Sequence, residues 1–145
     1  MNLKITKMEL SDLNSISNIL TSDFDNFWNY NILKDELLSK NSSYIIAKLD
    51  NQIVGFAGIK ILLEEADIMN IVVKKDFRNQ GIGNLLLEKL IQLAISLHLN
   101  SITLEVNEEN YPAIHLYEKF GFKQIGTRKS YYQDKDGLIM KKNLT

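Results

Sequence analysis

The strongest constraint on the fold is a long amphipathic helix predicted between two β-rich segments. From about Gly81 to Leu97, apolar residues recur at helical spacing over about four turns. The β-rich segment 66–73 precedes this helix, and segment 101–107, in which apolar and polar residues alternate, follows it. A helix that joins two strands of one sheet makes a parallel, right-handed crossover. We therefore expect an α/β (α+β) fold with this helix packed against the sheet.

Further strands are predicted on the N-terminal side. The β-rich runs 44–47, 53–59 and 66–73 form an antiparallel meander, and Asp50-Asn51 is a good hairpin turn between the first two. Residues 3–8 alternate like a half-buried strand. Ser11 suits the N-cap of a helix that carries Leu13, Ile16, Ile19 and Leu20, and a second helix is expected to start near Asn31.

The C-terminal third contains two clear helix signals. Pro112, the only proline, suits a first helical turn and Gly121 suits a left-handed C-terminal cap, which predicts a helix over 111–120. Segments 122–127 and 138–142 are then expected to be closing strands. Residues 1–145 are thus predicted to form a single domain, with a mixed sheet of about seven strands and about four helices.

Composition excludes several classes of function. Lys and Arg number 17 against 18 Asp and Glu, and the net charge of -1 argues against nucleic acid as a partner. The absence of Cys excludes disulfides and a cysteine acyl-enzyme, and no cluster has metal-ligand spacing, so no metal is expected. The N-terminus does not resemble a signal peptide, and no window offers the ~18 apolar residues of a membrane span. We expect a cytoplasmic protein without a membrane partner.

The segment Arg78-Asn79-Gln80-Gly81-Ile82-Gly83-Asn84 lies where the long helix begins. Free backbone N–H groups and the helix dipole make such a start an anion site. Two glycines let the backbone approach a diphosphate closely, and Arg78 adds charge at the rim. The segment matches neither the phosphate-loop nor the dinucleotide fingerprint. Taken alone, the glycines are also compatible with simple turn chemistry.

Several segments carry a family resemblance. Residues 78–83 resemble the Arg/Gln-x-x-Gly-x-Gly/Ala signature of the GNAT N-acetyltransferase family, and nearly the whole chain follows that family's order of elements. Leu104-Glu105-Val106, Asn110, the run 113–122 and Arg128-Lys129-Ser130-Tyr131-Tyr132 resemble the ribosomal-protein-alanine N-acetyltransferases.

The resemblance implies an acyl-CoA N-acyltransferase fold, and direct acetyl transfer from acetyl-CoA to an amine through a tetrahedral intermediate. It makes Glu105 the general base and Tyr117 the acid that protonates the leaving thiolate. It also implies that the Leu104-Glu105-Val106 strand splays from its neighbour. The residues that it assigns to acetyl-CoA are Ile71, Val72 and Val73 for the acetyl and pantetheine part, Asn79, Gln80, Gly81, Ile82, Gly83 and Asn84 for the diphosphate, and Asn110. Arg78 joins these candidates through its charge at the rim of the helix start.

The residues alone leave other roles open for the catalytic pair. Glu105 alternates with apolar residues on its strand, so it also fits a solvated carboxylate or one paired with a Lys. Tyr117 lies between Ile114 and Phe120 at helical spacing, as a core aromatic would. His98 and His115 lack partners at useful spacing and are expected to be packing or surface residues on helices.

The acceptor is the least constrained part of the prediction. The first hypothesis is a protein N-terminus, the N-terminal alanine of a small-subunit ribosomal protein. A small-molecule amine, such as a polyamine or an antibiotic, is the second, and a non-catalytic acyl-CoA-binding regulatory module is the third. Residues 26–29 and 133–138 depart from the subfamily pattern on the acceptor side. Acidic residues at loop and strand ends favour a basic peptide: Glu64, Glu65, Asp67, Glu108 and Glu109.

Overall fold

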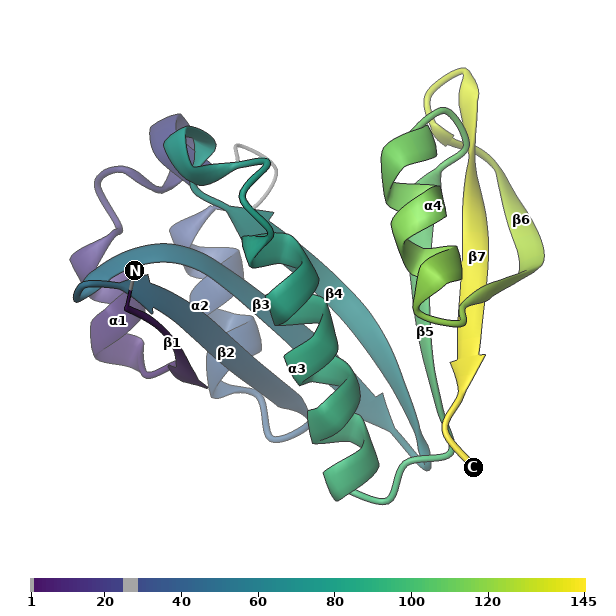
Figure 1. The fold of residues 1–145 in the computed structure, drawn as a ribbon, viewed down its shortest axis with the longest axis horizontal. Coiled ribbons are helices and arrows are strands. Elements are labelled where there is room, and N and C mark those ends of the chain that lie inside the picture. Colours follow the sequence, from purple (N-terminus) through teal and green to yellow (C-terminus); the bar gives the residue numbers. More distant parts are fainter. Residues whose placement is uncertain (1, 25–28) are drawn as a thin grey trace.

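The protein contains one seven-stranded sheet in the order β1-β2-β3-β4-β5-β7-β6 (Figure 1). The computed structural model describes residues 2–24 and 29–145. The strands are β1 (Leu3–Lys7), β2 (Ser42–Leu49), β3 (Gln52–Leu62), β4 (Glu65–Val73), β5 (Ser101–Asn107), β6 (Lys123–Tyr132) and β7 (Lys135–Asn143). Only the pair β4–β5 is parallel among the paired strands of these residues. The mixed sheet and the parallel crossover are therefore confirmed.

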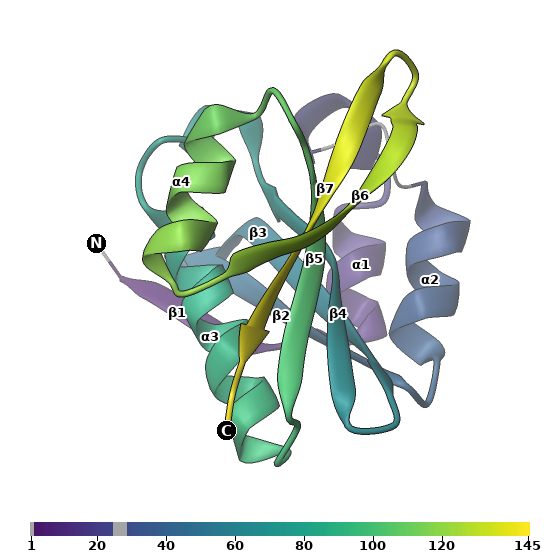
Figure 2. The ribbon, with the colours of Figure 1, turned by 90° about the vertical axis from the view of Figure 1, so that its right-hand side faces the viewer.

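The helices cover both faces of the sheet (Figure 2). They are α1 (Leu10–Ser15), the π-helical turn η1 (Leu20–Phe24), α2 (Tyr30–Leu38), the 3₁₀ turn η2 (Lys75–Phe77), α3 (Ile82–Ser96) and α4 (Tyr111–Lys119). Leu86, Leu87 and Leu90 of α3 belong to a core under one face of the sheet. Leu13 of α1 and Leu33 of α2 belong to a second core on the other face. No helix in the described residues is long and apolar enough to cross a bilayer.

The meander forms as predicted. Asp50 and Asn51 have φ values of 49° and 72°, and two central residues with positive φ match the twist of the flanking strands. Gly58 on β3 lies under the ring of Tyr44 on β2, and a Cβ there would come 2.3 Å from the ring. The glycine is required by this contact and not by its backbone angles.

The first helix differs from the prediction. Ser11 lies within α1, and the N-cap is Glu9, whose carboxylate and that of Asp12 form a capping box. The helix ends at Ser15 because the hydroxyls of Ser15 and Ser17 bond to the carbonyls of Asp12 and Asn14. The apolar residues expected on a single helix, such as Leu13 and Leu20, still reach one core.

The strands β4 and β5 pair over only three residues and then separate. The parallel ladder runs from Glu65–Ser101 to Asp67–Thr103. Farther along, Met69 is an extra residue opposite β3, because Asn70 pairs with Gly58 while Ile68 pairs with Ile59. Beyond this point the two ribbons diverge (Figure 1). The splay implied by the family resemblance is present, and from Met69 onward the β4 edge facing β5 has no ladder partner in the described chain.

The closing hairpin is longer than predicted. The segments expected at 122–127 and 138–142 extend to Tyr132 and start at Lys135. The added part of β6 is largely exposed and polar, so it lacks the alternation by which strands are recognised. The preceding helix agrees with its signals, since Pro112 lies in the first turn of α4 and Gly121 has φ of 93°.

Candidate active site

The start of α3 faces the start of α4 across a pocket of about 390 Å³. Gly81 caps α3 with φ of 85°, and a Cβ there would meet no atom of the described chain within 4 Å. The Oδ1 atom of Asn110 caps α4 by accepting from the Ala113 N–H at 3.3 Å. Because both helices present their N-terminal ends here, backbone N–H groups and two helix dipoles favour an anion. The predicted residues that line this pocket are Arg78, Asn79, Gly81, Ile82, Gly83, Asn84, Asn110 and Val73.

Two predicted diphosphate residues have different surroundings from those expected. Arg78 donates from Nε to the Val73 carbonyl at 3.0 Å and from Nη2 to the Phe24 carbonyl at 2.8 Å. Its charge lies at the pocket, but these bonds also fasten the end of β4 to η1. Gln80 is exposed and lines none of the pockets described here.

A second pocket, of about 310 Å³, lies in the splay beyond the β4–β5 ladder. Ile71, Val72 and Val73 line it from β4, and Leu116 and Tyr117 line it from α4. It shares Val73, Arg78, Asn79 and Gly83 with the pocket at the helix starts. The two pockets therefore form a continuous path from the anion site to the free edge of β4.

Tyr117 has features of both a core aromatic residue and the expected proton donor. Its ring packs on Phe122 with centroids 5.9 Å apart, as a core aromatic would. Burial, with a smaller contribution from Tyr132, raises the pKa of the Tyr117 hydroxyl. The side chain is therefore a protonated phenol near neutral pH, and it borders the pocket at the β4 edge.

Glu105 borders a third pocket, of about 550 Å³, with Asp67, Met69, Tyr131 and Tyr132. Its Oε1 atom pairs with Arg128 Nη2 at 2.9 Å. The Oε2 atom is buried and has no hydrogen-bond partner in the described residues. The expected Lys partner is thus an Arg, and one carboxylate oxygen is left for another donor.

Tyr132 is close to both proposed catalytic residues. The pKa of its hydroxyl is raised by burial first, and then by Tyr131 and by the charge of Glu105. It contributes in turn to the raised pKa of Tyr117. Glu105 and Tyr117 line different pockets, and both pockets are bordered by β4. The structure thus places a carboxylate and a neutral phenol at the two sides of the splay.

The acidic residues expected near the acceptor do not come together. Asp67 lines the Glu105 pocket, where burial and the neighbouring Glu65 raise the pKa of its carboxyl. Glu65 pairs with Lys141 at 3.0 Å, and Glu109 pairs with Lys135 at 3.5 Å. Of the five predicted acidic residues, Asp67 alone lines this pocket within residues 2–24 and 29–145. The departure noted at 26–29 falls mostly on residues 25–28, outside the described residues.

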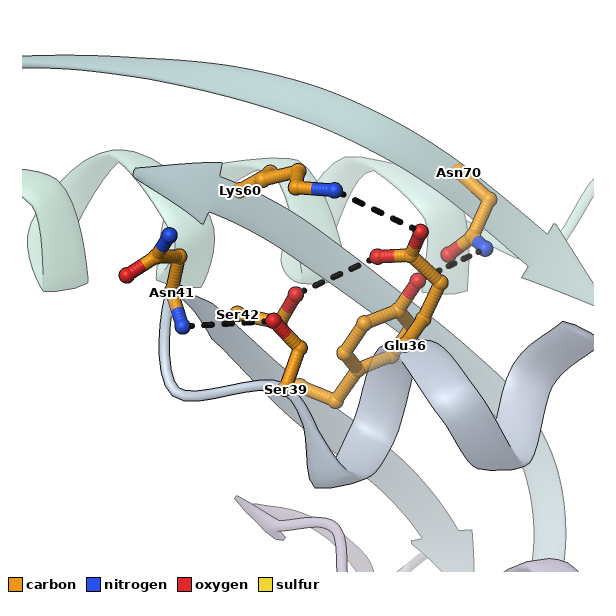
Figure 3. Close-up of polar contacts among 7 residues, drawn as sticks. Glu36, Ser39, Asn41, Ser42, Lys60 and Asn70 are labelled. Carbon is orange, nitrogen blue, oxygen red and sulfur yellow. Dashed lines mark hydrogen bonds and ion pairs between the residues drawn. The ribbon is translucent and has the colours of Figure 1, made fainter. Parts of the chain in front are cut away.

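Buried polar residues hold β4 from the other side. Asn70, next to the Met69 bulge, donates from Nδ2 to the Tyr44 hydroxyl at 3.3 Å. Glu36 of α2 accepts from Ser42 at 3.2 Å and pairs with Lys60 at 3.8 Å (Figure 3). The Asn70 bond ties β4 to β2 next to the point where β4 begins to separate from β5, and the Glu36 contacts tie α2 to β2 and β3.

The residues that sequence reasoning missed as site residues are Arg128, Tyr131, Tyr132 and Met69. The register of β6 places the first three at the site, and the bulge in β4 places Met69 there. Neither feature follows from local sequence patterns. The run 128–132 was noted as part of the family resemblance, which was the available signal. The histidines are exposed: His98 lies just past α3 with φ of 60°, not within a helix as expected, and His115 is on α4.

A splayed mixed sheet with an anion site at the helix that follows it defines the fold of acyl-coenzyme A N-acyltransferases. The sequence profile of the acetyltransferase (GNAT) family matches residues 12–122. The chain belongs to this family, and it is an N-acetyltransferase that uses acetyl-CoA.

Individual relatives span most of the chain. A protein of Bacillus subtilis (strain 168), provisionally named a [ribosomal protein bS18]-alanine N-acetyltransferase, is 34% identical over 139 residues, which are 94% of this chain and 92% of the relative. The Haemophilus influenzae [ribosomal protein bS18]-alanine N-acetyltransferase is 38% identical over 112 residues, 76% of this chain and 74% of its own. The crystal structure of the Escherichia coli ribosomal-protein-S18-alanine N-acetyltransferase superposes with a TM-score of 0.90 at 28% identity, covering 99% of this chain and 95% of that one.

Proposed function

We propose that this enzyme acetylates the N-terminal alanine α-amine of a small-subunit ribosomal protein of the bS18 kind. The observation that supports it most is the position of Glu105 and Tyr117 at the two sides of the splay, with the free edge of β4 between them. The names of relatives that match most of this chain support the same acceptor. A ribosomal acceptor would place the protein in the cytoplasm.

The acetyl donor fits the continuous path along β4 and α3. The N–H groups at the start of α3, with Asn79, Gly81 and Gly83, would bind the diphosphate. Ile71, Val72 and Val73 would bind the pantetheine and acetyl part through the free β4 edge. Gly83 borders both pockets, so a side chain at this position would narrow the path.

The reaction requires two proton transfers. An α-amine with a pKa of about 7.7–8.0 attacks a thioester only in its neutral form. Glu105 would remove the amine proton, directly or through water, as the C–N bond forms. Tyr117 would donate its phenolic proton to the sulfur as the C–S bond breaks. Burial raises the pKa of this phenol, so the side chain carries that proton at neutral pH before the step.

The acceptor would enter through the Glu105 pocket. This pocket is large enough for a peptide end, and Tyr131 and Tyr132 of the β6–β7 hairpin form one wall. Asp67 adds an exposed carboxylate to the lining of this pocket, which would suit a basic side chain following the terminal residue.

Mass spectrometry of an Ala-initiated ribosomal peptide after incubation with acetyl-CoA tests the proposal. We expect one acetyl group on the α-amine and none on lysine side chains. The matched control is the same peptide with its α-amine already blocked, which should stay unmodified. Acetyl transfer to polyamines or aminoglycosides but not to the peptide would favour the small-molecule alternative. Coenzyme binding without turnover on any amine would indicate a regulatory module.

A further inference from the structure

Arg128 contacts the proposed base, Glu105, although their strands β6 and β5 are not adjacent in the sheet. The sheet order β5-β7-β6 puts β7 between Arg128 and Glu105. In the register, Arg128 is opposite Gly137, and Glu105 is opposite Ile139 on the same strand. The Arg128 side chain must therefore extend over β7 to place Nη2 at 2.9 Å from Glu105 Oε1.

The path over β7 is shaped by a glycine. A Cβ on Gly137 would lie 3.3 Å from the Tyr131 ring, a contact that is tighter than usual. The Tyr131 ring in turn lies under the Arg128 guanidinium, with 5.0 Å from Cζ to the ring centroid. A cation over an aromatic face is attracted to it, so the ring restricts where the guanidinium can lie.

The ion pair uses one oxygen of the carboxylate and leaves the other. The Glu105 side chain is 24% exposed and that of Arg128 is 56% exposed. Oε2 is buried without a partner in the described chain, which is costly for a carboxylate oxygen. A donor that enters this pocket and bonds to Oε2 would remove that cost.

We propose that Arg128 is a positioning residue that holds Glu105 through Oε1 and so directs Oε2 toward the N–H of the acceptor amine. This inference rests on the proposed role of Glu105 as the base. Arg128 does not transfer a proton, because a guanidinium stays protonated in proteins. Its charge also disfavours a protonated amine beside Glu105, which leaves the reactive neutral form as the preferred ligand.

The test compares Arg128→Met and Arg128→Lys with Lys129→Met as the matched control, since Lys129 is an exposed cation on the same strand. We expect Arg128→Met to lower kcat roughly 10- to 100-fold, the fold-change for one charge-assisted hydrogen bond. The Kd for coenzyme A should stay unchanged, and the peptide KM should change much less than kcat. The kcat of Arg128→Lys should lie between those of the wild-type enzyme and Arg128→Met, because lysine keeps the charge but lacks the planar guanidinium group.

Chemical rescue separates positioning from a purely structural role. Guanidinium at millimolar concentration should restore part of the kcat of Arg128→Met and leave Lys129→Met unaffected. An Arg128→Met enzyme with unchanged or increased kcat, or a reduced kcat that guanidinium does not restore, would overturn the inference. Glu105→Gln is assayed alongside: if that variant keeps full turnover, the proposed base itself is wrong, whereas an inactive Glu105→Gln with a fully active Arg128→Met rejects only the role of Arg128.

Discussion

Replacing Gly83 with alanine should change two properties of the enzyme in opposite directions. Gly83 is the second residue of α3, and its φ is not in the left-handed region. Alanine is favoured over glycine inside a helix by ~0.8–1.0 kcal/mol, and by less in the first turn. Among the described residues, the new Cβ would have one contact within 4 Å, with Val73 Cγ2 at 3.8 Å, and this distance is no clash. We expect Tm to rise by roughly 1–4 °C.

The same methyl group should weaken coenzyme binding. Gly83 borders both pockets that would hold the donor, so the added carbon points into the space that the diphosphate or pantetheine would occupy. Displacing one charge-assisted hydrogen bond costs ~1.5–3 kcal/mol, which corresponds to an increase in Kd of roughly 10-fold or more.

Gly81→Ala, a second substitution at the proposed diphosphate site, is the comparison for the effect on stability. A Cβ at Gly81 meets open space, but its φ of 85° strains any L-residue, so this variant should lose ~1–2 kcal/mol of stability. Scanning calorimetry on coenzyme-free protein gives Tm, and isothermal titration with coenzyme A gives Kd. A Gly83→Ala enzyme with a higher Tm and an unchanged Kd would refute the placement of the donor beside the start of α3.

Three further predictions concern catalysis, pH dependence and packing. Glu105→Gln and Tyr117→Phe should each lower kcat roughly 10²-fold without changing the Kd for coenzyme A, as measured by thiol release and titration; unimpaired turnover in both would count against the assigned acid and base. Burial raises the pKa of Tyr44 to about 12, against about 10 in the unfolded chain. The neutral Tyr44 side chain therefore contributes roughly 2–3 kcal/mol to the free energy of unfolding below pH ~10, and this contribution is lost as the pH rises through about 12. In urea unfolding, the free energy of unfolding of Tyr44→Phe should fall less steeply with pH above pH ~10 than that of the wild-type protein. An equally steep fall for both proteins would contradict this. Gly58→Ala, whose Cβ would lie 2.3 Å from the Tyr44 ring, should lower the unfolding free energy by ~1–3 kcal/mol, and an unchanged urea midpoint would show that the ring moves freely.

The order of elements could be predicted because each signal is local. The helical spacing of α3 and the alternation in β5 depend only on nearby residues. The structure buries Leu86 and Leu90 and the apolar residues of β5, although Leu85 and Leu97 of the same helical pattern are exposed. The turn at Asp50-Asn51 and the cap at Gly121 are likewise set by backbone conformations that few residues tolerate.

The first helix shows where local signals compete. Ser11 is a good N-cap, but the N-cap is Glu9, two residues earlier, where the Glu9 and Asp12 carboxylates each accept from the backbone N–H of the other residue. The serine hydroxyls then end the helix at Ser15. Apolar spacing identified the buried residues, but it could not tell which of these hydrogen bonds would form.

The residues predicted for the coenzyme largely lie together in the fold, whereas the acidic residues predicted for the acceptor do not. The glycines near the start of α3 lie within a few residues of one another, so one segment carries the signal. The pairing of Arg128 with Glu105 depends on the order β5-β7-β6 and on the room left by Gly137, and neither follows from spacing along the chain. The family resemblance of residues 128–132 identified this segment but assigned no function to its residues.

A crystal structure of the enzyme with a coenzyme A–Ala-peptide bisubstrate conjugate would test the central claim most directly. We expect the diphosphate on the N–H groups at the start of α3, the pantetheine along Ile71 to Val73, and the alanine nitrogen within hydrogen-bond distance of Glu105 Oε2 or of a water bound to it. A diphosphate bound away from α3, or a peptide nitrogen on the opposite side of β4 from Glu105, would contradict it.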